Sequence, residues 1–215
     1  MINLRGFTAV ICGASSGIGA ATAELFANAG ARLILIARRE DALKRVAAAC
    51  ANSQEHAVHV CDFSKPLDVE QLADTLRQSD RIDILVNNAG IQHVARVEDF
   101  PPERWDAIIA INLTSAFHTS RLALPAMRRA NWGRIINVAS VHGLVGSAQK
   151  SAYVAAKHGI VGLTKVTALE TATTGITANA ICPGWVLTPL VQKQVDAKAA
   201  AHGLSNEEAT KLLLG

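Results

Sequence analysis

Short apolar runs alternate along this chain with longer segments in which apolar residues recur every three or four positions. Runs of the first kind are typical of buried strands, and segments of the second kind of helices that pack through one face. The expected strands cover residues 7–12, 33–37, 57–61, 82–86, 134–138 and 177–181. The expected helices cover residues 18–29, 39–50, 67–76, 105–111, 113–129 and 152–171. This order predicts an α/β fold, a three-layer, doubly wound parallel sheet of the Rossmann type.

After Pro189 the alternation stops and only helical patterns remain. One covers residues 190–201, and a second begins at Ser205, which has the spacing of a capping box with Glu208. We expect a helical flap here rather than another strand–helix unit. The chain has no internal repeat and no linker, and its 215 residues suit one domain, so residues 1–215 are interpreted as a single domain.

The composition fits a compact protein that binds a small molecule. Half of the residues are hydrophobic, and the net charge of +3 comes without a run of Lys or Arg, which argues against nucleic acid. The four cysteines have neither metal-ligand spacing nor the density of a disulfide framework, so we expect no metal and free thiols in a reducing cytoplasm. No apolar run approaches the roughly 20 residues that span a bilayer, and no secretory signal is visible. A cytoplasmic location without membrane attachment is therefore expected.

A glycine-rich turn between the first expected strand and helix is the first candidate binding site. Its sequence is GASSGIG, residues 13–19. Here backbone amides and the positive end of the helix dipole can face a pyrophosphate, and glycines let the backbone approach it. The spacing differs from the commoner G-x-G-x-x-G, and such a pattern alone also suits a tight structural turn. We predict that a dinucleotide binds through Gly13, Ser15, Ser16, Gly17, Ile18 and Gly19.

The residues after the next two strands concern the adenosine end of such a ligand. Arg38 and Arg39 stand at the end of the second strand, where an acid would bind a free ribose hydroxyl. Two cations there favour a 2′-phosphate, and hence NADP over NAD. The arginines could instead be solvated residues that open a helix, and Glu40 and Asp41 lie close by. Asp62, just past the third strand, could bind adenine or could be a turn residue.

Tyr153 and Lys157 are the candidates for proton transfer. They are four residues apart in an expected helix, so both side chains project from one face. A phenol of pKa about 10 is a poor proton shuttle near neutrality, and a neighbouring ammonium in a desolvated cleft would lower that pKa. The pair alone is a common accident on helices. However, Ser140 follows a strand thirteen residues earlier, and Asn112 lies in the helical region after the fourth strand.

Five ordered motifs make the chain resemble the short-chain dehydrogenase/reductase family from about Arg5 to about Thr188. They are residues 13–19, Asn87-Asn88-Ala89-Gly90, Ser140, Tyr153-Val154-Ala155-Ala156-Lys157 and Pro183-Gly184. The resemblance implies an oxidoreductase that moves a hydride between NAD or NADP and a small alcohol or ketone. It implies that Tyr153 is the general acid/base, that Ser140 orients the substrate oxygen and that Lys157 binds the nicotinamide ribose. Asn112 would hold a water of the proton path. Implied cofactor contacts beyond the turn are Arg38, Asp62, Phe63, Asn88, Ala89, Gly90, Tyr153, Lys157, Pro183, Gly184, Val186 and Thr188.

The second half is similar to the branch of this family that interconverts 3-hydroxybutyrate and acetoacetate. The similarity rests on residues 92–93, 140–145, 149–153 and 183–194. A short hydroxy acid needs its carboxylate held at one end, where Lys150 would supply a charge and neighbouring side chains hydrogen bonds. Each of these residues also has a common structural explanation, such as a solvated lysine. The predicted substrate-binding residues are Gln92, Ser140, His142, Lys150, Tyr153, Trp185 and Gln192, with residues 185–215 as the lid.

Three departures from the family pattern leave alternatives open. Cys12 replaces a usual threonine near the cofactor turn, and Arg38 favours NADP although the hydroxybutyrate branch uses NAD. The chain also ends at Gly215, before the family's last helix and strand, so we expect the sheet to lack that edge strand. The alternatives are an NADPH-dependent reductase of another small carbonyl compound and a non-catalytic dinucleotide-binding protein. The resemblance also implies a homo-oligomer, a tetramer.

Overall fold

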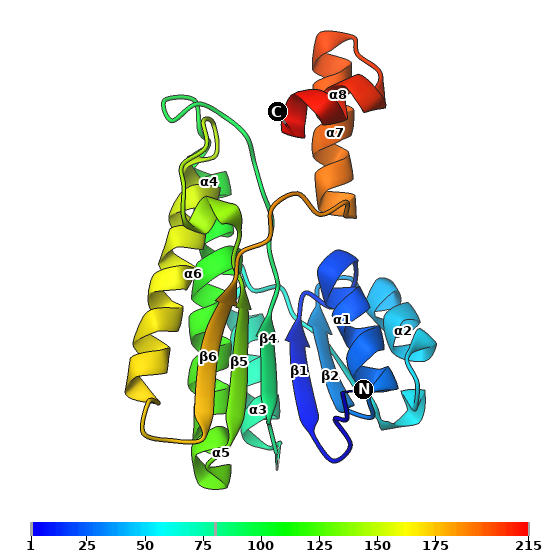
Figure 1. Cartoon of the computed structure of the whole chain (residues 1–215), viewed down its shortest axis with the longest axis vertical. Coiled ribbons are helices and arrows are strands. Elements are labelled where there is room, and N and C mark those ends of the chain that lie inside the picture. The colour runs from blue at the N-terminus through cyan, green and yellow to red at the C-terminus, as the bar shows by residue number, and fades with distance from the viewer. Residues whose placement is uncertain (1, 80, 215) are drawn as a thin grey trace.

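Six parallel strands form the central sheet of residues 2–79 and 81–214, the part of the chain that the computed structural model describes. They are β1 (Thr8–Cys12), β2 (Arg32–Ala37), β3 (Ala57–Val60), β4 (Ile84–Asn87), β5 (Gly133–Val138) and β6 (Ile176–Ile181). Their order is β3-β2-β1-β4-β5-β6, and all neighbouring pairs are parallel (Figure 1). The strand order reverses between β1 and β4, which is the point where doubly wound sheets bind ligands. The predicted fold class is confirmed, with β6 at one edge of the sheet.

Helices cover both faces of the sheet. α1 (Gly17–Asn28) and α2 (Glu40–Ala49) pack on one face, whereas α3 (Pro66–Arg77), α5 (Ser115–Ala130) and α6 (Ser151–Glu170) pack on the other. β1 is buried at every position, because its alternate residues enter different cores. Val10 and Cys12 join the core beneath α3 and α5, and Ala9 and Ile11 join the core beneath α1 and α2. A sheet buried on both faces explains why the strands are apolar throughout.

The helical region after β4 differs from its predicted boundaries. α4 begins three residues earlier than expected and covers Pro102–Ile109. It passes without a break through a π-helical turn, Ala110–Thr114, into α5, so the expected helices 105–111 and 113–129 form one continuous helical segment. Asn112 lies inside the π-helical turn, within the helical region where it was predicted. A π-helical turn within an α-helix frequently marks a functional site.

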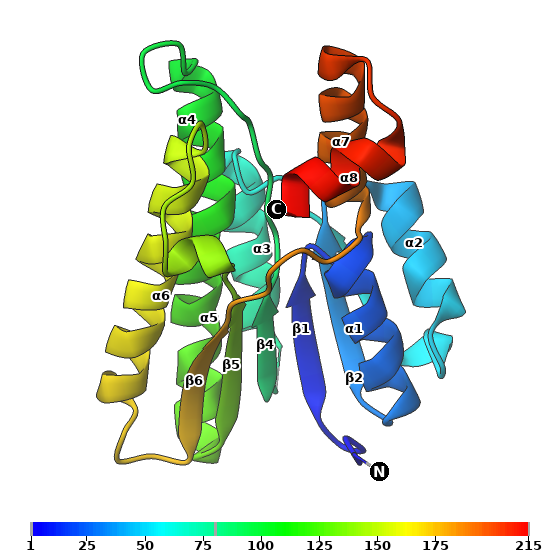
Figure 2. The ribbon, with the colours of Figure 1, turned by 45° about the horizontal axis from the view of Figure 1, so that its top comes forward.

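Two helices, α7 (Pro189–His202) and α8 (Asn206–Leu214), form a pair beyond the carboxyl ends of the strands (Figures 1 and 2). The capping box of α8 is confirmed, because the Ser205 backbone amide donates to Glu208 Oε2 over 2.9 Å and the Glu208 amide donates to Ser205 Oγ over 3.3 Å. Val195, Ala199 and Ala209 form a small core between the two helices. None of the helices in the described ranges is long and apolar enough to cross a membrane.

Candidate active site

The glycine turn lies against the end of β4 through close backbone contacts. Gly13 has a φ of +75°, and a Cβ there would lie 2.8 Å from the backbone of Ala89. The Asn88 side-chain amide donates to the Gly13 carbonyl over 3.2 Å, and a Cβ on Gly19 would lie 2.6 Å from the same amide nitrogen. Gly13 and Gly19 are therefore required by packing within the protein, whereas the sequence analysis attributed these glycines to the approach of a ligand.

A cavity of about 410 Å³ opens over this turn, between the strand ends and the start of α7. The predicted cofactor residues in its wall are Gly13, Ser15, Ser16, Gly17, Ile18, Arg38, Phe63, Asn88, Ala89, Gly90 and Thr188. Predicted cofactor residues that do not line it are Gly19, Asp62, Tyr153, Lys157, Pro183, Gly184 and Val186. Gly17 is in contact with the base of α7, since a Cβ there would lie 3.3 Å from Thr188. The cavity is thus bounded by elements from both ends of the chain.

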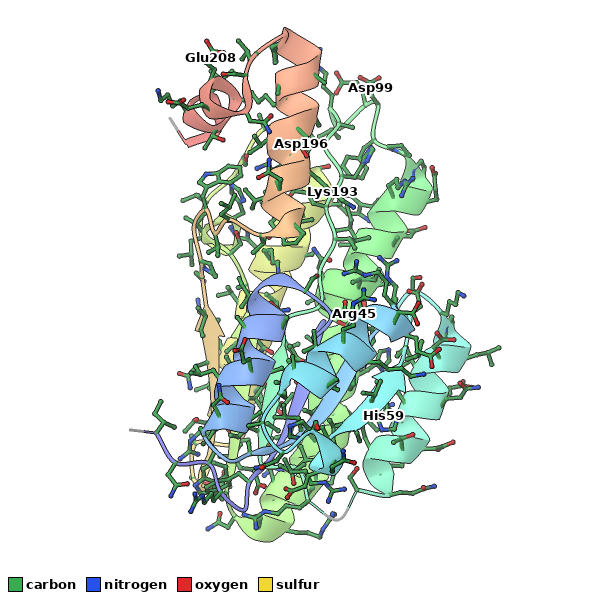
Figure 3. All side chains as sticks on the ribbon, turned by 90° about the vertical axis from the view of Figure 1, so that its right-hand side faces the viewer. Arg45, His59, Asp99, Lys193, Asp196 and Glu208 are labelled. Carbon is green, nitrogen blue, oxygen red and sulfur yellow. The ribbon has the colours of Figure 1, made fainter. Side chains whose placement is uncertain are left out.

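The wall also contains Arg39, which was considered with Arg38 for a 2′-phosphate, and residues with no predicted cofactor role: Ala37, Cys61, Ile91, Ile111, Pro189, Leu190 and Lys193. Lys193 lies on the half of α7 that is nearer to α1 and α2 (Figure 3). The apolar residues of α7 do not gather on one face of the helix, so its sequence does not indicate which side chains point toward the sheet.

Two guanidinium groups line the cavity at the carboxyl end of β2. Arg39 Nη2 lies 3.2 Å from Ser16 Oγ in the glycine turn. Arg38 Nη1 lies 3.9 Å from Asp62 Oδ2. Burial opposes ionisation of Asp62, but hydrogen bonds from Ser64 and the charge of Arg38 outweigh it and hold the pKa of Asp62 below its usual value. Asp62 is thus already engaged with a cation and a turn.

Tyr153 and Lys157 project from the same face of α6 at the carboxyl end of β5. Lys157 Nζ lies 5.6 Å from the centre of the Tyr153 ring. It donates a hydrogen bond over 2.7 Å to the carbonyl of Val138, the last residue of β5. Ser140, two residues further along, accepts a hydrogen bond from the His142 amide over 3.2 Å, and its hydroxyl lies close enough to Tyr153 to affect the pKa of that phenol. β5 and α6 thus place a phenol, an ammonium and a hydroxyl at one point beside the sheet.

Asn112 is buried, and its side chain is fully engaged by the segment that follows β4. Its Oδ1 accepts from the Ile91 amide over 2.9 Å, and its Nδ2 donates to the Ile91 carbonyl over 2.9 Å. Gly90 lies next to the Asn112 side chain, since a Cβ added to Gly90 would be 3.7 Å from Asn112 Oδ1. The π-helical turn therefore ties the residues 88–91 to the helix that follows them.

Burial determines the protonation behaviour of the Tyr153–Lys157 pair. Lys157 is 4% exposed, and burial lowers its pKa from 10.5 to about 8, against a small opposing effect of Cys182. Burial also raises the pKa of Tyr153, while the neighbouring Ser140 hydroxyl acts in the opposite direction. The spacing of Tyr153 and Lys157 in the sequence predicts a lowered phenol pKa. In the structure that direction is reversed, because desolvation of the phenolate outweighs the interactions that favour it.

Three predicted substrate residues, His142, Lys150 and Trp185, lie next to one another, and His142 also lies next to Tyr153. The His142 ring stands edge-on to the Tyr153 ring at 6.0 Å, and Lys150 Nζ lies 4.9 Å from the centre of the Trp185 ring. Lys150 is only 9% exposed. Its pKa is lowered by burial and then by the charge of Lys198 on α7, a residue that the sequence analysis did not single out. Burial and Lys150 in turn lower the pKa of His142.

The two predicted glutamines differ. Gln92 Nε2 is buried and has no hydrogen-bond partner within the described ranges. Gln192 Nε2 donates over 2.9 Å to Asp196 Oδ1 one turn further along α7. Gln192 is therefore engaged within its own helix, while Gln92 has an unused donor.

The four cysteines are free thiols, and Cys182 lies near enough to Lys157 to affect the pKa of that ammonium. Cys12, which replaces the usual threonine, is 2% exposed and belongs to the core beneath the glycine turn. Burial raises the pKa of Cys61, in the cavity wall, to about 12. Within residues 2–79 and 81–214, no group of three His, Cys, Asp or Glu side chains is placed to hold a metal ion.

Comparison with known proteins gives the family. The family model described as short chain dehydrogenase matches residues 7–199. A D-beta-hydroxybutyrate dehydrogenase of Cupriavidus necator is 62% identical over 214 residues, which are 98% of this chain and 83% of that protein. A second protein of that name, from Rhizobium meliloti, is 51% identical over 205 residues, 94% of this chain and 80% of that protein.

Two solved structures are similar in fold to this chain. A variant of actinorhodin polyketide ketoreductase with NADPH matches with a TM-score of 0.87 and 34% identity, over 97% of this chain and 82% of that chain. Levodione reductase matches with a TM-score of 0.85 and 34% identity, over 97% of this chain and 81% of that chain.

Proposed function

Because this chain belongs to the short-chain dehydrogenase family, we propose that it is an NAD(P)-dependent dehydrogenase that interconverts 3-hydroxybutyrate and acetoacetate. The observation that carries the substrate class is Lys150. The residue is only 9% exposed, the charge of Lys198 acts on its ammonium, and no ion pair of the described residues includes it. A buried charge requires an opposite charge or hydrogen bonds, and a substrate carboxylate would supply both.

The cavity over the glycine turn fits a dinucleotide. The turn's backbone and the N-terminus of α1 would hold the pyrophosphate, and the small residues Asn88, Ala89 and Gly90 leave space for a flat ring. When bound, the nicotinamide accepts the hydride in oxidation and donates it in reduction.

Tyr153 is proposed as the general acid/base. In oxidation it takes the proton of the substrate hydroxyl as the hydride leaves the carbon that bears this hydroxyl. In reduction it returns a proton to the carbonyl oxygen as the hydride is added to the carbonyl carbon. Ser140 orients the substrate oxygen through its hydroxyl, and Lys157 favours the phenolate by its charge. Tyr153→Phe should leave dinucleotide affinity nearly unchanged and lower turnover by at least about 100-fold. Near-normal turnover of this variant would remove the tyrosine from the mechanism.

The substrate proposal is tested with paired substrates. Lys150→Met should raise the KM for 3-hydroxybutyrate by roughly 10- to 100-fold, since a hydrogen bond to a charged group is lost, and should spare an uncharged secondary alcohol. Lys165→Met is the matched control, because Lys165 is an exposed lysine of α6. Equal effects of Lys150→Met on both substrates would contradict the carboxylate role.

We propose NADP as the preferred cofactor. Arg38 and Arg39 both line the cavity at the end of β2, where a 2′-phosphate would lie, and β2 itself ends on Ala37 rather than on an acid. Arg39→Asp should lower kcat/KM for NADP by about 10-fold or more and reverse the preference. Arg45→Asp, on the exposed side of α2, is the control (Figure 3). A preference for NAD in the unmodified protein would overturn this proposal and leave the substrate proposal intact.

A second candidate function follows from the same arginines. An NADPH-dependent reductase of a different small carbonyl compound would use the same Tyr153 chemistry, and it is favoured by Arg39. It differs in the role of Lys150, because an uncharged ketone has no carboxylate. Initial rates with acetoacetate and with an uncharged ketone of similar size, each with NADPH and NADH, separate the two candidates.

We also propose that the protein is a homo-oligomer, and specifically a tetramer. Large apolar side chains are exposed on the outer faces of two neighbouring helices, Phe117 on α5 and Val166 and Leu169 on α6. Exposed apolar patches of this kind mark protein interfaces. Light scattering after gel filtration measures the assembly, and a monomer at micromolar concentration would contradict it.

A further inference from the structure

A chain of buried amides and hydroxyls crosses the core between the sheet and its helices. Asn87 Nδ2, at the end of β4, donates to Asn137 Oδ1 on β5 over 2.8 Å. Asn137 Nδ2 donates to Thr164 Oγ1 on α6 over 2.8 Å. Thr119 Oγ1 on α5 donates to Asn87 Oδ1 over 2.7 Å. All four residues are at most 5% exposed, so this polar chain lies entirely inside an apolar core.

Two members of this polar chain, Asn137 and Thr164, connect it to the candidate site. Asn137 is the residue before Val138, whose carbonyl accepts the hydrogen bond of Lys157. Thr164 lies seven residues after Lys157, two turns along α6, and therefore on the same face of the helix. α6 is thus fastened to β5 by two polar contacts on one face, Lys157 to Val138 and Thr164 to Asn137.

The two contacts differ in what they require. The Lys157 side chain has four rotatable methylene groups and can follow a small movement of the helix. The Asn137 amide is fixed by two partners, and a bond of 2.8 Å loses its geometry when the helix slides or turns by a fraction of an ångström. Apolar packing of Ala156 and Ile160 on the same face is non-directional and tolerates such a movement more easily.

We propose that the Asn137–Thr164 hydrogen bond is a positioning contact, which holds α6 at the height where the Lys157 ammonium meets both the Val138 carbonyl and the Tyr153 ring. This inference rests on the assignment of Tyr153 and Lys157 under the proposed function. It gives two core residues that touch neither substrate nor cofactor an effect on the proton chemistry of the site.

The test compares two threonines of the same helix. Thr164 and Thr167 are both 5% exposed, and both hydroxyls donate to the carbonyl four residues earlier, but only Thr164 accepts a bond from the sheet. Thr164→Val and Thr167→Val therefore both remove a buried hydroxyl, but only Thr164→Val also removes the hydrogen bond with Asn137. Rates of hydroxyacid oxidation are measured against pH, together with the affinity for the reduced dinucleotide by fluorescence.

Thr164→Val should move the acidic limb of the kcat profile upward by about half a pH unit or more, because the ammonium is displaced from the phenol. It should also lower kcat by about tenfold or more, with dinucleotide affinity unchanged. Thr167→Val should keep the profile of the unmodified protein. The other titratable groups at the pair are His142, Lys150 and Cys182, and none is altered by either change.

Equal pH profiles of the two valine variants would overturn the inference and reduce Thr164 to a structural residue. Thr164→Ser keeps the hydroxyl and should restore the normal profile, and it remains decisive if Thr164→Val does not fold. A shifted profile in Thr164→Ser would also overturn the inference, since the lost methyl group and not the hydrogen bond would then be responsible. If Tyr153→Phe is active, the proposed function fails independently of both threonines.

Discussion

Lys157→Met should make the folded protein more stable near neutral pH while it ends catalysis. Burial lowers the pKa of Lys157 from 10.5 to about 8. At about 1.4 kcal/mol for each pKa unit, keeping this ammonium inside the folded protein costs roughly 3 kcal/mol near pH 7. Methionine has a similar shape and no charge. It loses the hydrogen bond to the Val138 carbonyl, which costs about 1–2 kcal/mol, so the net gain is about 1–2 kcal/mol.

The gain has a pH dependence with a definite sign. Because the pKa of Lys157 is lower in the folded protein than in the unfolded chain, the unfolded chain binds more protons between about pH 8 and pH 10.5. Stability of the unmodified protein therefore recovers as the pH rises through this window, and the cost is fully present below it. The advantage of Lys157→Met should shrink by roughly 3 kcal/mol across the window and become a deficit near its upper end.

Urea unfolding near pH 7 and near pH 10 measures both free energies of unfolding. Lys165→Met, an exposed position on the same helix, is the control and should change neither value by more than about 0.5 kcal/mol. A difference between Lys157→Met and the unmodified protein that stays constant with pH would refute the reasoning, because the cost would then not come from the buried charge.

Three other changes have outcomes that follow from local contacts. Gly19→Ala should destabilise the fold by about 1–3 kcal/mol, since the added Cβ would collide with the glycine turn. Gly162→Ala, in open space on α6, should stabilise the fold by about 0.5–1 kcal/mol. Thermal unfolding that ranks the two variants in the opposite order would contradict this. Asp83→Asn should lower the free energy of unfolding in urea by about 2–4 kcal/mol, because the buried Asp83 carboxylate accepts hydrogen bonds from a backbone amide and a guanidinium. The exposed control Asp74→Asn should lower it by less than about 0.5 kcal/mol. Similar losses for the two variants would refute the reasoning. Lys193→Gln removes a cation from the cavity wall, so it should weaken dinucleotide affinity by about 3- to 10-fold and reduce the salt dependence of that affinity in fluorescence titrations. An unchanged affinity at low salt would remove Lys193 from the site.

The strands and most helices could be predicted because each has a simple cause. A strand buried on both faces, such as β1 or β2, must be apolar at almost every position, and the helices between parallel strands need one apolar face. The π-helical turn around Asn112 could not be predicted. Such a turn adds a residue without changing composition, and the Asn112 side chain is hydrogen-bonded to Ile91, which is distant in sequence.

The site was predictable where residues follow a strand end or share a helix face. Ser140 follows β5 and Tyr153 and Lys157 are four apart, so topology and helix geometry suffice to bring them together. The direction of the Tyr153 pKa was wrong, because it depends on how much water the fold removes. The approach of Lys198 to Lys150 was likewise invisible, since it depends on where the α7–α8 pair lies relative to α6.

The instability at Lys157 and its proposed role have the same physical origin. On the surface of α6, water would keep an ammonium at its ordinary pKa and would screen its effect on a phenol 5.6 Å away. The neighbours Ala152, Ala156 and Ile160 exclude that water, because they are small or apolar and let the helix approach the sheet closely. Exclusion of water strengthens any effect of the ammonium on Tyr153, and it is also what makes the ammonium costly to bury. A change on this face that admits water should therefore relieve part of the cost of burying the ammonium and, at the same time, weaken the effect of that ammonium on Tyr153.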